Sequence, residues 1–216
     1  MFQNIDSVIY FKLIGIDTFL KTVNYRDELK SLLVKAFAPA GYQITENIKL
    51  DPIPENSKYD ALFFALNDKK IIYRKGKVTT DRPGAFLSVW QRPSTPVING
   101  NKPIPLHTNQ LDYLFIRVEE HFTGESNKES INNLRSGIFI FPTSLLIDKK
   151  IVSSNDNKGK TGFRVFPPWS QSRGNEGTQV FSESGKKTQY WQLPYFVEID
   201  GNGLIDSSAL NIVFNK

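Results

Sequence analysis

Short apolar segments with the length and alternation of β-strands recur along most of the chain. Segments 59–66 and 69–78 are separated by Asn67 and Asp68, a pair typical of a tight hairpin turn. Segment 84–92 follows as the third strand of a meander. Further strands are predicted at 111–118, 136–142 and 161–166, and a last strand at 195–199.

Helical patterns are fewer than strand patterns. Before Pro39 and Gly41, apolar residues recur at helical spacing, at Leu29, Leu32, Leu33, Ala36 and Phe37. Two shorter helices are predicted at 143–149 and 183–192. Because the strands occur in adjacent runs without βα alternation, the pattern predicts an α+β fold, with a mixed, mainly antiparallel sheet and flanking helices. At 216 residues, the whole chain is expected to form a single domain.

Composition excludes several kinds of site. The chain has no cysteine, which excludes disulfides, thiolate catalysis and cysteine zinc sites. With only His107 and His121, a histidine metal cluster is not expected, and no phosphate-binding glycine motif occurs. We therefore predict no cofactor. The apolar run 8–16 is interrupted by Lys12 and is too short to span a membrane, so no membrane partner and a cytoplasmic location are expected.

Positive charge is concentrated in two segments. The net charge is +5. Residues 69–92 contain seven Lys or Arg and one acid, whereas residues 149–192 contain eight Lys or Arg and three acids. These two segments together hold more positive charge than the chain as a whole, which points to an anionic partner.

The second segment combines cations with large aromatic residues. KGKTGFRVFPPW, residues 158–169, places Lys158, Lys160 and Arg164 close to Trp169. KKTQYWQLPYF, residues 186–196, places Lys187 four residues before Trp191, so the two adjoin on one face of a helix. Lys and Arg neutralise phosphates, and aromatic rings stack on unpaired bases. The alternative is that these rings belong to the core and the lysines are only solvated.

Several ordered motifs carry a family resemblance. YDALFFAL, YRKGK, GAFLSVWQR, GIFIFP, RVFPPW and TQYWQ follow one another between about residues 51 and 199, and this succession resembles the MepB-like family of small bacterial proteins. Residues 1–50 precede it as a helical N-terminal extension. The resemblance implies a core similar to that of restriction endonucleases and, as function, the binding of DNA or RNA.

We expect the cations of both segments to lie on one outer surface. The residues predicted to bind nucleic acid are Arg74, Lys75, Lys77, Arg92, Lys158, Lys160, Arg164, Lys187 and Gln189. Those predicted to stack on bases or to support this surface are Trp90, Trp169 and Trp191.

Two other functions stay open. A Mg²⁺-dependent nuclease of the restriction-endonuclease type needs a first carboxylate, for which Asp60 is a weak candidate, and a second acid two residues before a lysine. That acid would fall at Tyr73 or Lys75, so binding without cleavage is expected unless Glu46, Glu55 or Asp112 completes the site. Alternatively, the aromatic residues line a pocket in which Arg74, Arg92 and Arg164 hold an anionic small molecule or peptide.

Overall fold

The computed structural model describes residues 24–92, 102–121 and 134–216. The apolar run 8–16 and most of the polar insertion between the strands at 111–118 and 136–142 lie outside the described residues. Among the helices in these three ranges, none has both the length and the apolar character needed to cross a membrane.

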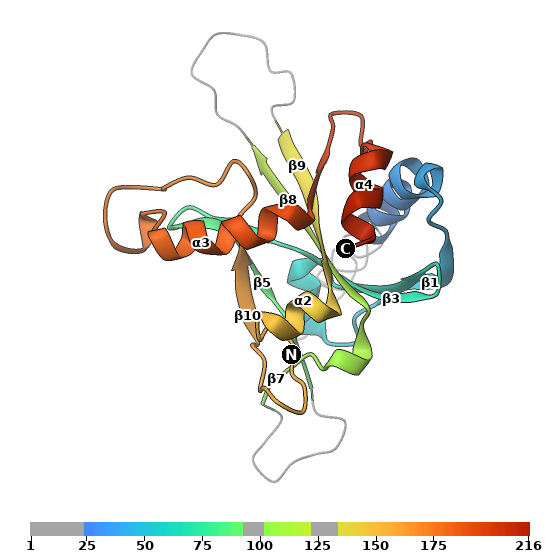
Figure 1. Cartoon of the computed structure of the whole chain (residues 1–216), viewed down its shortest axis with the longest axis horizontal. Helices are drawn as coiled ribbons and strands as arrows, with labels where there is room; N and C mark the ends of the chain where they lie inside the picture. Colours follow the sequence, from blue (N-terminus) through green and yellow to red (C-terminus); the bar gives the residue numbers. More distant parts are fainter. Residues whose placement is uncertain (1–23, 93–101, 122–133) are drawn as a thin grey trace, which may run out of the picture.

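A six-stranded mixed sheet forms the centre of the fold (Figure 1). Its order is β1–β2–β3–β8–β9–β11. The only parallel neighbours in this sheet are β3 and β8, and the other pairs are antiparallel. The strands are β1 (Ile44–Leu50), β2 (Leu62–Leu66), β3 (Lys69–Lys75), β8 (Tyr113–His121), β9 (Leu134–Pro142) and β11 (Phe196–Ile199). The predicted α+β fold with a mixed, mainly antiparallel sheet is confirmed.

The turn between β2 and β3 follows from its two residues. Asn67 and Asp68 have φ angles of 47° and 62°, the left-handed values of a type I′ hairpin turn, which Asn and Asp tolerate well. Residues 44–50 form the edge strand β1, within the segment 41–57 where the sequence predicts a connection with a weak strand, so the description of residues 1–50 as helical does not hold for this part. The strand signal is weak because most of the side chains of β1 are exposed.

A second, three-stranded sheet corrects the predicted meander. β5 (Arg82–Ser88) pairs with β4 (Lys77–Thr79) and with β10 (Gly162–Val165), in the order β10–β5–β4. It cannot pair with β3 because β2 and β8 occupy both edges of that strand. Its inner face packs on β8, where Ala85 and Leu87 join Leu114 and Ile116 in one buried cluster. Beyond β5, β6 (Trp90–Gln91) pairs with β7 (Ile104–Pro105).

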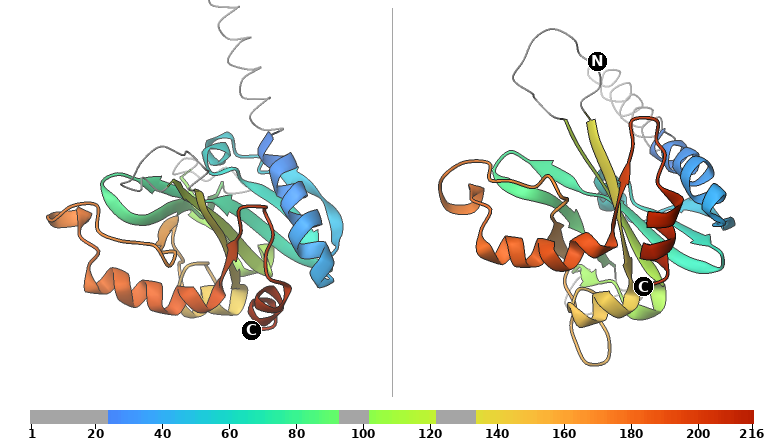
Figure 2. Two further views of the ribbon diagram at one scale, coloured as in Figure 1. Left: turned by 90° about the horizontal axis from the view of Figure 1, so that it is seen from above. Right: turned by 45° about the horizontal axis from the view of Figure 1, so that its top comes forward.

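Helices cover the two faces of the main sheet. On one face, the helix at residues 24–32, with η1 (Leu33–Phe37) and η2 (Ala38–Ala40), lies beside α4 (Ser207–Phe214), as Figures 1 and 2 show. The other face carries the second sheet, α2 (Thr143–Asp148) and α3 (Glu183–Gln192). The helices at α2 and α3 were predicted from the sequence, whereas α4 was not.

The stability of this fold depends on pH in the alkaline range, because several tyrosines are buried or half-buried. Burial raises the pKa of Tyr73, and to a lesser degree burial also raises the pKa of Tyr42, Tyr59 and Tyr113. Between the ordinary tyrosine pKa of about 10 and these raised values, the unfolded chain loses protons that the folded chain retains. The stabilising effect of the neutral phenols is therefore complete below pH 10 and is lost as the pH rises above it.

We expect the free energy of unfolding, measured with urea, to fall as the pH rises above 10. Tyr73→Phe should reduce this slope by up to about 1.4 kcal/mol per pH unit, the contribution of one proton. Tyr190→Phe is the matched control, because Tyr190 is 83% exposed. Equal slopes in Tyr73→Phe and Tyr190→Phe would contradict this explanation.

Candidate functional site

The pairing of β5 with β10 brings the two basic segments together. In the register of the three-stranded sheet, Phe86 on β5 lies opposite Lys77 on β4 and Arg164 on β10. Directly opposite residues in neighbouring strands share a face of the sheet. We call Lys77, Phe86 and Arg164 the basic row. Its face is opposite to the one on which Ala85 and Leu87 are buried, and in this row Lys77 is exposed whereas Phe86 is half-buried against the core.

The short helix η3 (Pro54–Tyr59) extends the basic row with a second lysine. The Tyr59 ring meets the Phe86 ring edge-to-face at 6.2 Å. The Nζ atoms of Lys77 and Lys58 lie 5.5 Å and 5.3 Å from the centroid of the Tyr59 ring, within the range of cation–π contacts. Both lysines are exposed, and within the described ranges neither forms an ion pair. Their charges therefore stay available to an outside anion.

Arg164 is committed to the protein itself. Its Nη1 donates to the carbonyl oxygen of Pro83 at 3.1 Å, and its Nη2 donates to Oγ1 of Thr79 at 3.2 Å. Burial, together with the nearby charges of Arg82 and Arg173, lowers its pKa against the opposing effect of Asp81. Arg164 was predicted to contact phosphate, but its guanidinium closes the turn between β4 and β5.

The last two residues of β3, Arg74 and Lys75, lie on opposite faces of the main sheet. Arg74 shares a face with Ile72 and is fully buried, so its predicted place on an outer surface is wrong. Lys75 shares the other face with Tyr73, and its Nζ lies 2.6 Å from the carboxylate of Glu119. A strand alternates its side chains, and a run of neighbouring cations therefore cannot form one patch.

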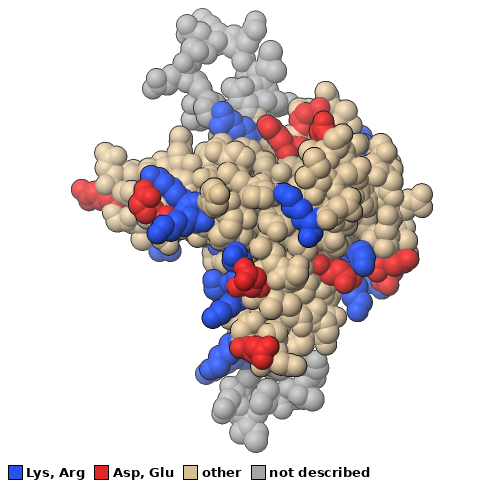
Figure 3. Space-filling model, viewed as in Figure 1, with Lys and Arg blue, Asp and Glu red and all other residues tan. Residues whose placement is uncertain are grey.

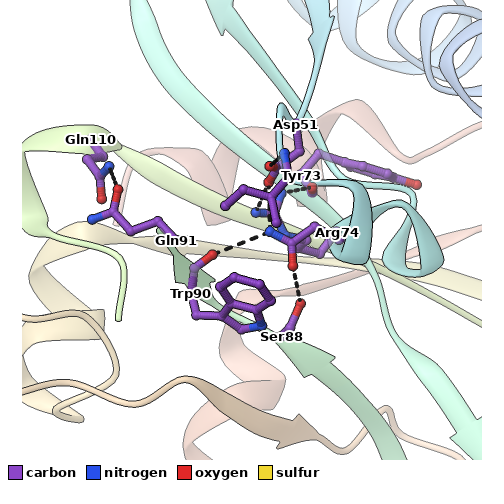
Figure 4. Close-up of polar contacts among 9 residues, drawn as sticks. Asp51, Tyr73, Arg74, Ser88, Trp90, Gln91 and Gln110 are labelled. Atoms are coloured by element: carbon purple, nitrogen blue, oxygen red, sulfur yellow. Dashed lines mark hydrogen bonds and ion pairs between the residues drawn. The ribbon is translucent and has the colours of Figure 1, made fainter. Parts of the chain in front are cut away.

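Arg74 anchors a buried polar cluster, which we define as Asp51, Asn56, Arg74 and Ser88. Figure 4 labels Asp51, Arg74 and Ser88 of this cluster. Oδ2 of Asp51 accepts from Nη2 of Arg74 at 2.7 Å and from Nδ2 of Asn56 at 3.1 Å. Oδ1 of Asn56 accepts from the Ser88 hydroxyl at 3.0 Å, and Nδ2 of Asn56 also reaches the carbonyl oxygen of Trp90 at 3.4 Å. Burial lowers the pKa of Arg74 to about 10, against the opposing effect of Asp51.

Asp51 of this cluster also lines a pocket beside Trp90. The pocket has a volume of about 410 Å³, and we call it the Trp90 pocket. Ile53, Phe63, Trp90 and Leu106 line it with apolar surface, and its polar lining comes from Asp51, Gln91, Arg92 and Gln110. The Arg92 guanidinium lies 5.0 Å from the centroid of the Trp90 ring and forms an ion pair with Glu55. A second, more open hollow of about 640 Å³ is also lined by Gln91, together with Lys158.

The remaining predicted residues lie toward α3 and the loop before β10. Lys158 and Lys160 are exposed on that loop. Lys187 is exposed on α3, whose Trp191 packs on Phe141 behind the three-stranded sheet, so Lys187 is not part of the basic row. On the face that carries α2 and α3, Lys and Arg atoms alternate with Asp and Glu atoms (Figure 3). The single basic surface that we predicted thus does not extend over this face.

Two predicted contacts on this side are structural. Nε2 of Gln189 donates to the carbonyl oxygen of Pro167 at 2.9 Å and so holds α3 against the segment that follows β10. Trp169 packs edge-to-face on Phe196 at 5.5 Å and is half-buried. Trp169 and Trp191 therefore support the fold, whereas Trp90 alone of the three tryptophans lines one of the two hollows described above.

The carboxylates considered for a nuclease are not gathered around a metal position. Asp60 ends η3 with a left-handed φ of 47°. Glu46 pairs with Lys49, Glu55 pairs with Arg92, and Asp112 accepts from the backbone N–H of Lys70 at 2.8 Å. In the part of the chain that the structure describes, no three His, Asp or Glu side chains form a group that could hold a metal ion. His107 caps the short helix η4 (Thr108–Gln110).

Most of the residues that build this site were not predicted from the sequence. Asp51, Asn56, Ser88, Gln91 and Gln110 come from distant positions, and only the fold brings them together. One signal was present in the sequence, because Arg74 follows Ile71, Ile72 and Tyr73 in a buried strand. A charged residue in such a strand requires a buried partner, although its identity does not follow from the sequence.

Comparison with known proteins identifies the family to which the chain belongs. The model of the family described as MepB-like matches residues 54–198, which include the basic row and Trp90. Among solved structures, the crystal structure of MepB is similar to this chain, with 29% sequence identity and a TM-score of 0.53, over 71% of this chain and 87% of that one. No curated protein matches it. The chain belongs to the MepB-like family.

Proposed function

We propose that this protein binds DNA or RNA through the exposed lysines around the β5–β10 pair, without cleaving it. The observation that supports this best is the register that places Lys77 and Arg164 on either side of Phe86 and so joins the two basic segments. Lys58 and Lys77 lie at one end of this surface. At the other end, the N–H of Val89 donates to the carbonyl oxygen of Thr161 at 2.9 Å, so the pairing continues toward exposed Lys160.

Lysines in this arrangement suit a phosphate backbone. Neighbouring phosphates in a strand repeat the same charge, and each ammonium group that neutralises one of them releases a counterion. A cation–π contact holds a lysine side chain without neutralising its charge. The alternative of an anionic small molecule held by three arginines has less support, because Arg74, Arg92 and Arg164 each bind different groups of the protein. With such a partner, we also propose a cytoplasmic location in a bacterial cell.

The test is a titration of labelled single- and double-stranded DNA and RNA at several NaCl concentrations, with Mg²⁺ and with EDTA. We expect retention that weakens steeply with salt, and intact nucleic acid in both buffers. In Lys77→Ala/Lys160→Ala, the slope of log affinity against log salt should decrease by about 1.4 to 1.8, since each lost contact contributes about 0.7 to 0.9.

The control removes the same charge elsewhere. Lys149 and Lys186 form ion pairs with Asp148 and Glu183, and Lys149→Ala/Lys186→Ala should keep nearly the full salt slope. If neither double variant changes the slope, or both change it equally, the lysines around β5 and β10 are not the contact surface. Cleavage that requires Mg²⁺ would favour the nuclease alternative.

A further inference from the structure

The Trp90 pocket has the dimensions of a small-molecule site, and the phosphate contacts proposed above do not use it. Its volume of about 410 Å³ falls within the range of about 300–1,000 Å³ that is usual for ligand pockets. Ile53, Phe63 and Leu106 supply apolar walls. Polar groups are few and lie at defined points, which suits a flat apolar ring with a polar edge.

The charged groups that line the pocket are compensated by the protein. Oδ2 of Asp51 accepts from Arg74 and Asn56, and Oδ1 of Asp51 accepts from the backbone N–H of Ile53 at 2.9 Å. Arg92 forms an ion pair with Glu55. A ligand that enters therefore meets a wall that is close to neutral. A neutral ring is favoured over a free anion, which would have to compete with these carboxylates.

Trp90 and Arg92 provide flat surfaces for such a ring. Their 5.0 Å approach places a guanidinium plane over an indole, and both groups line the pocket. Unpaired bases of nucleic acids stack on aromatic side chains and on arginine planes. The backbone of Trp90 is held by a hydrogen bond, since its carbonyl oxygen accepts from Nδ2 of buried Asn56 at 3.4 Å.

Two carboxamides lie where they can bond to the edge of the ring. Nε2 of Gln110 donates to Oε1 of Gln91, and Oε1 of Gln110 accepts from the backbone N–H of His107 at 2.6 Å. A carboxamide nitrogen carries two N–H groups, so Gln110 keeps a second donor. Carboxamides form paired hydrogen bonds with base edges. These bonds fix the orientation of both glutamines before a ligand arrives.

Trp90, which lines the pocket, shares a side of its strand with Phe86 of the basic row. Along β5 and β6, Phe86, Ser88 and Trp90 alternate with Leu87 and Val89, which are buried on the opposite face. A strand whose phosphates lie on Lys77 and Lys160 thus runs past the pocket. We propose that the Trp90 pocket accepts one unpaired base of the bound nucleic acid, stacked on Trp90 and Arg92 and bonded to Gln110. This inference rests on the proposed function and specifies its substrate as a strand with an unpaired base.

The experiment compares three labelled DNA duplexes of one sequence by fluorescence anisotropy. One is fully paired, one has a single bulged adenine, and one has an abasic residue at the bulge. We expect the adenine bulge to bind roughly tenfold more tightly than the abasic bulge, within the range of about 5- to 150-fold that one stacked base gives. Trp90→Ala should remove this difference and keep the affinity for the paired duplex within about twofold.

Two further variants, one in the pocket and one control outside it, complete the test. Gln110→Leu should reduce the preference for the adenine bulge, and it serves in place of Trp90→Ala if that variant does not fold. Tyr190→Ala, which removes an exposed aromatic ring on α3, should retain the full preference. Equal binding of all three duplexes by the unchanged protein would overturn the pocket inference and leave the proposed function standing. Absence of binding to any duplex or single strand would overturn both.

Discussion

Arg74→Met should lower the free energy of unfolding by about 3–5 kcal/mol, the usual cost of leaving a buried charge without its partner. The Asp51 side chain is 3% exposed and lies 2.7 Å from the guanidinium. Methionine keeps an unbranched apolar side chain in place of the arginine but offers no donor. The carboxylate would then keep only the Ile53 and Asn56 bonds, and its charge would remain in the interior. Urea unfolding at neutral pH measures the effect.

Arg92→Met is the matched control for Arg74→Met. Arg92 forms the same kind of ion pair with Glu55, but the two side chains are 36% and 50% exposed. Pairs of this kind contribute about 0–1 kcal/mol, and the loss should be correspondingly small. If Arg74→Met and Arg92→Met cost the same, the buried cluster does not stabilise the fold as described.

A double-mutant cycle separates the ion pair from the packing of the arginine side chain. Asp51→Asn/Arg74→Met removes both charges at once and should destabilise the protein by clearly less than the sum of the two single changes. An additive result would mean that Arg74 stabilises the protein by filling volume. The distinction matters for the Trp90 pocket, whose wall includes Asp51.

The local elements of this fold could be predicted because their signals lie within short windows. The turn at Asn67 and Asp68 depends on two residues, and the α3 helix begins after Ser182, whose hydroxyl accepts from the N–H of Gly185. The partner of β5 could not be predicted in this way. Its pairing with β10 joins residues about eighty positions apart, and nothing in the pattern of β5 distinguishes β10 from β3 as a neighbour.

The candidate site was predictable in composition but not in arrangement. Charge concentration identified the two segments that β5 and β10 bring together. Charge concentration does not indicate which way a side chain points. Arg74 was therefore predicted on the outer surface, although it is buried. Arg164 was predicted to contact phosphate, although its guanidinium donates to Pro83 and Thr79. The pocket beside Trp90 depends on Gln91 and Gln110, polar residues without a motif. Only tertiary structure reveals such a group.

The β5–β10 contact on which the proposed surface depends has a steric requirement at Gly84. Gly84 has a φ of 70°, and a Cβ atom there would lie 2.4 Å from the carbonyl oxygen of Val165 and 2.6 Å from the Phe166 ring. Gly84→Ala should therefore destabilise the protein by about 2–5 kcal/mol. The left-handed backbone accounts for about 1–2 kcal/mol of this loss and overpacking against β10 for about 1–3 kcal/mol.

Gly41→Ala separates these two contributions. Gly41 also has a left-handed φ, of 92°, but a Cβ atom there would meet no atom within 4 Å. Its substitution should cost only the backbone contribution of about 1–2 kcal/mol. The difference between the two variants, measured by urea unfolding, is then the steric cost of separating β10 from β5.

Because this separation also moves Arg164 away from Phe86, amide hydrogen exchange at Phe163 and Val165 should become faster in Gly84→Ala and stay unchanged in Gly41→Ala. Equal stability of the two variants would show that β10 can move away from β5 without loss of free energy of unfolding. The pairing of β5 with β10 would then not hold the residues of the basic row in fixed positions.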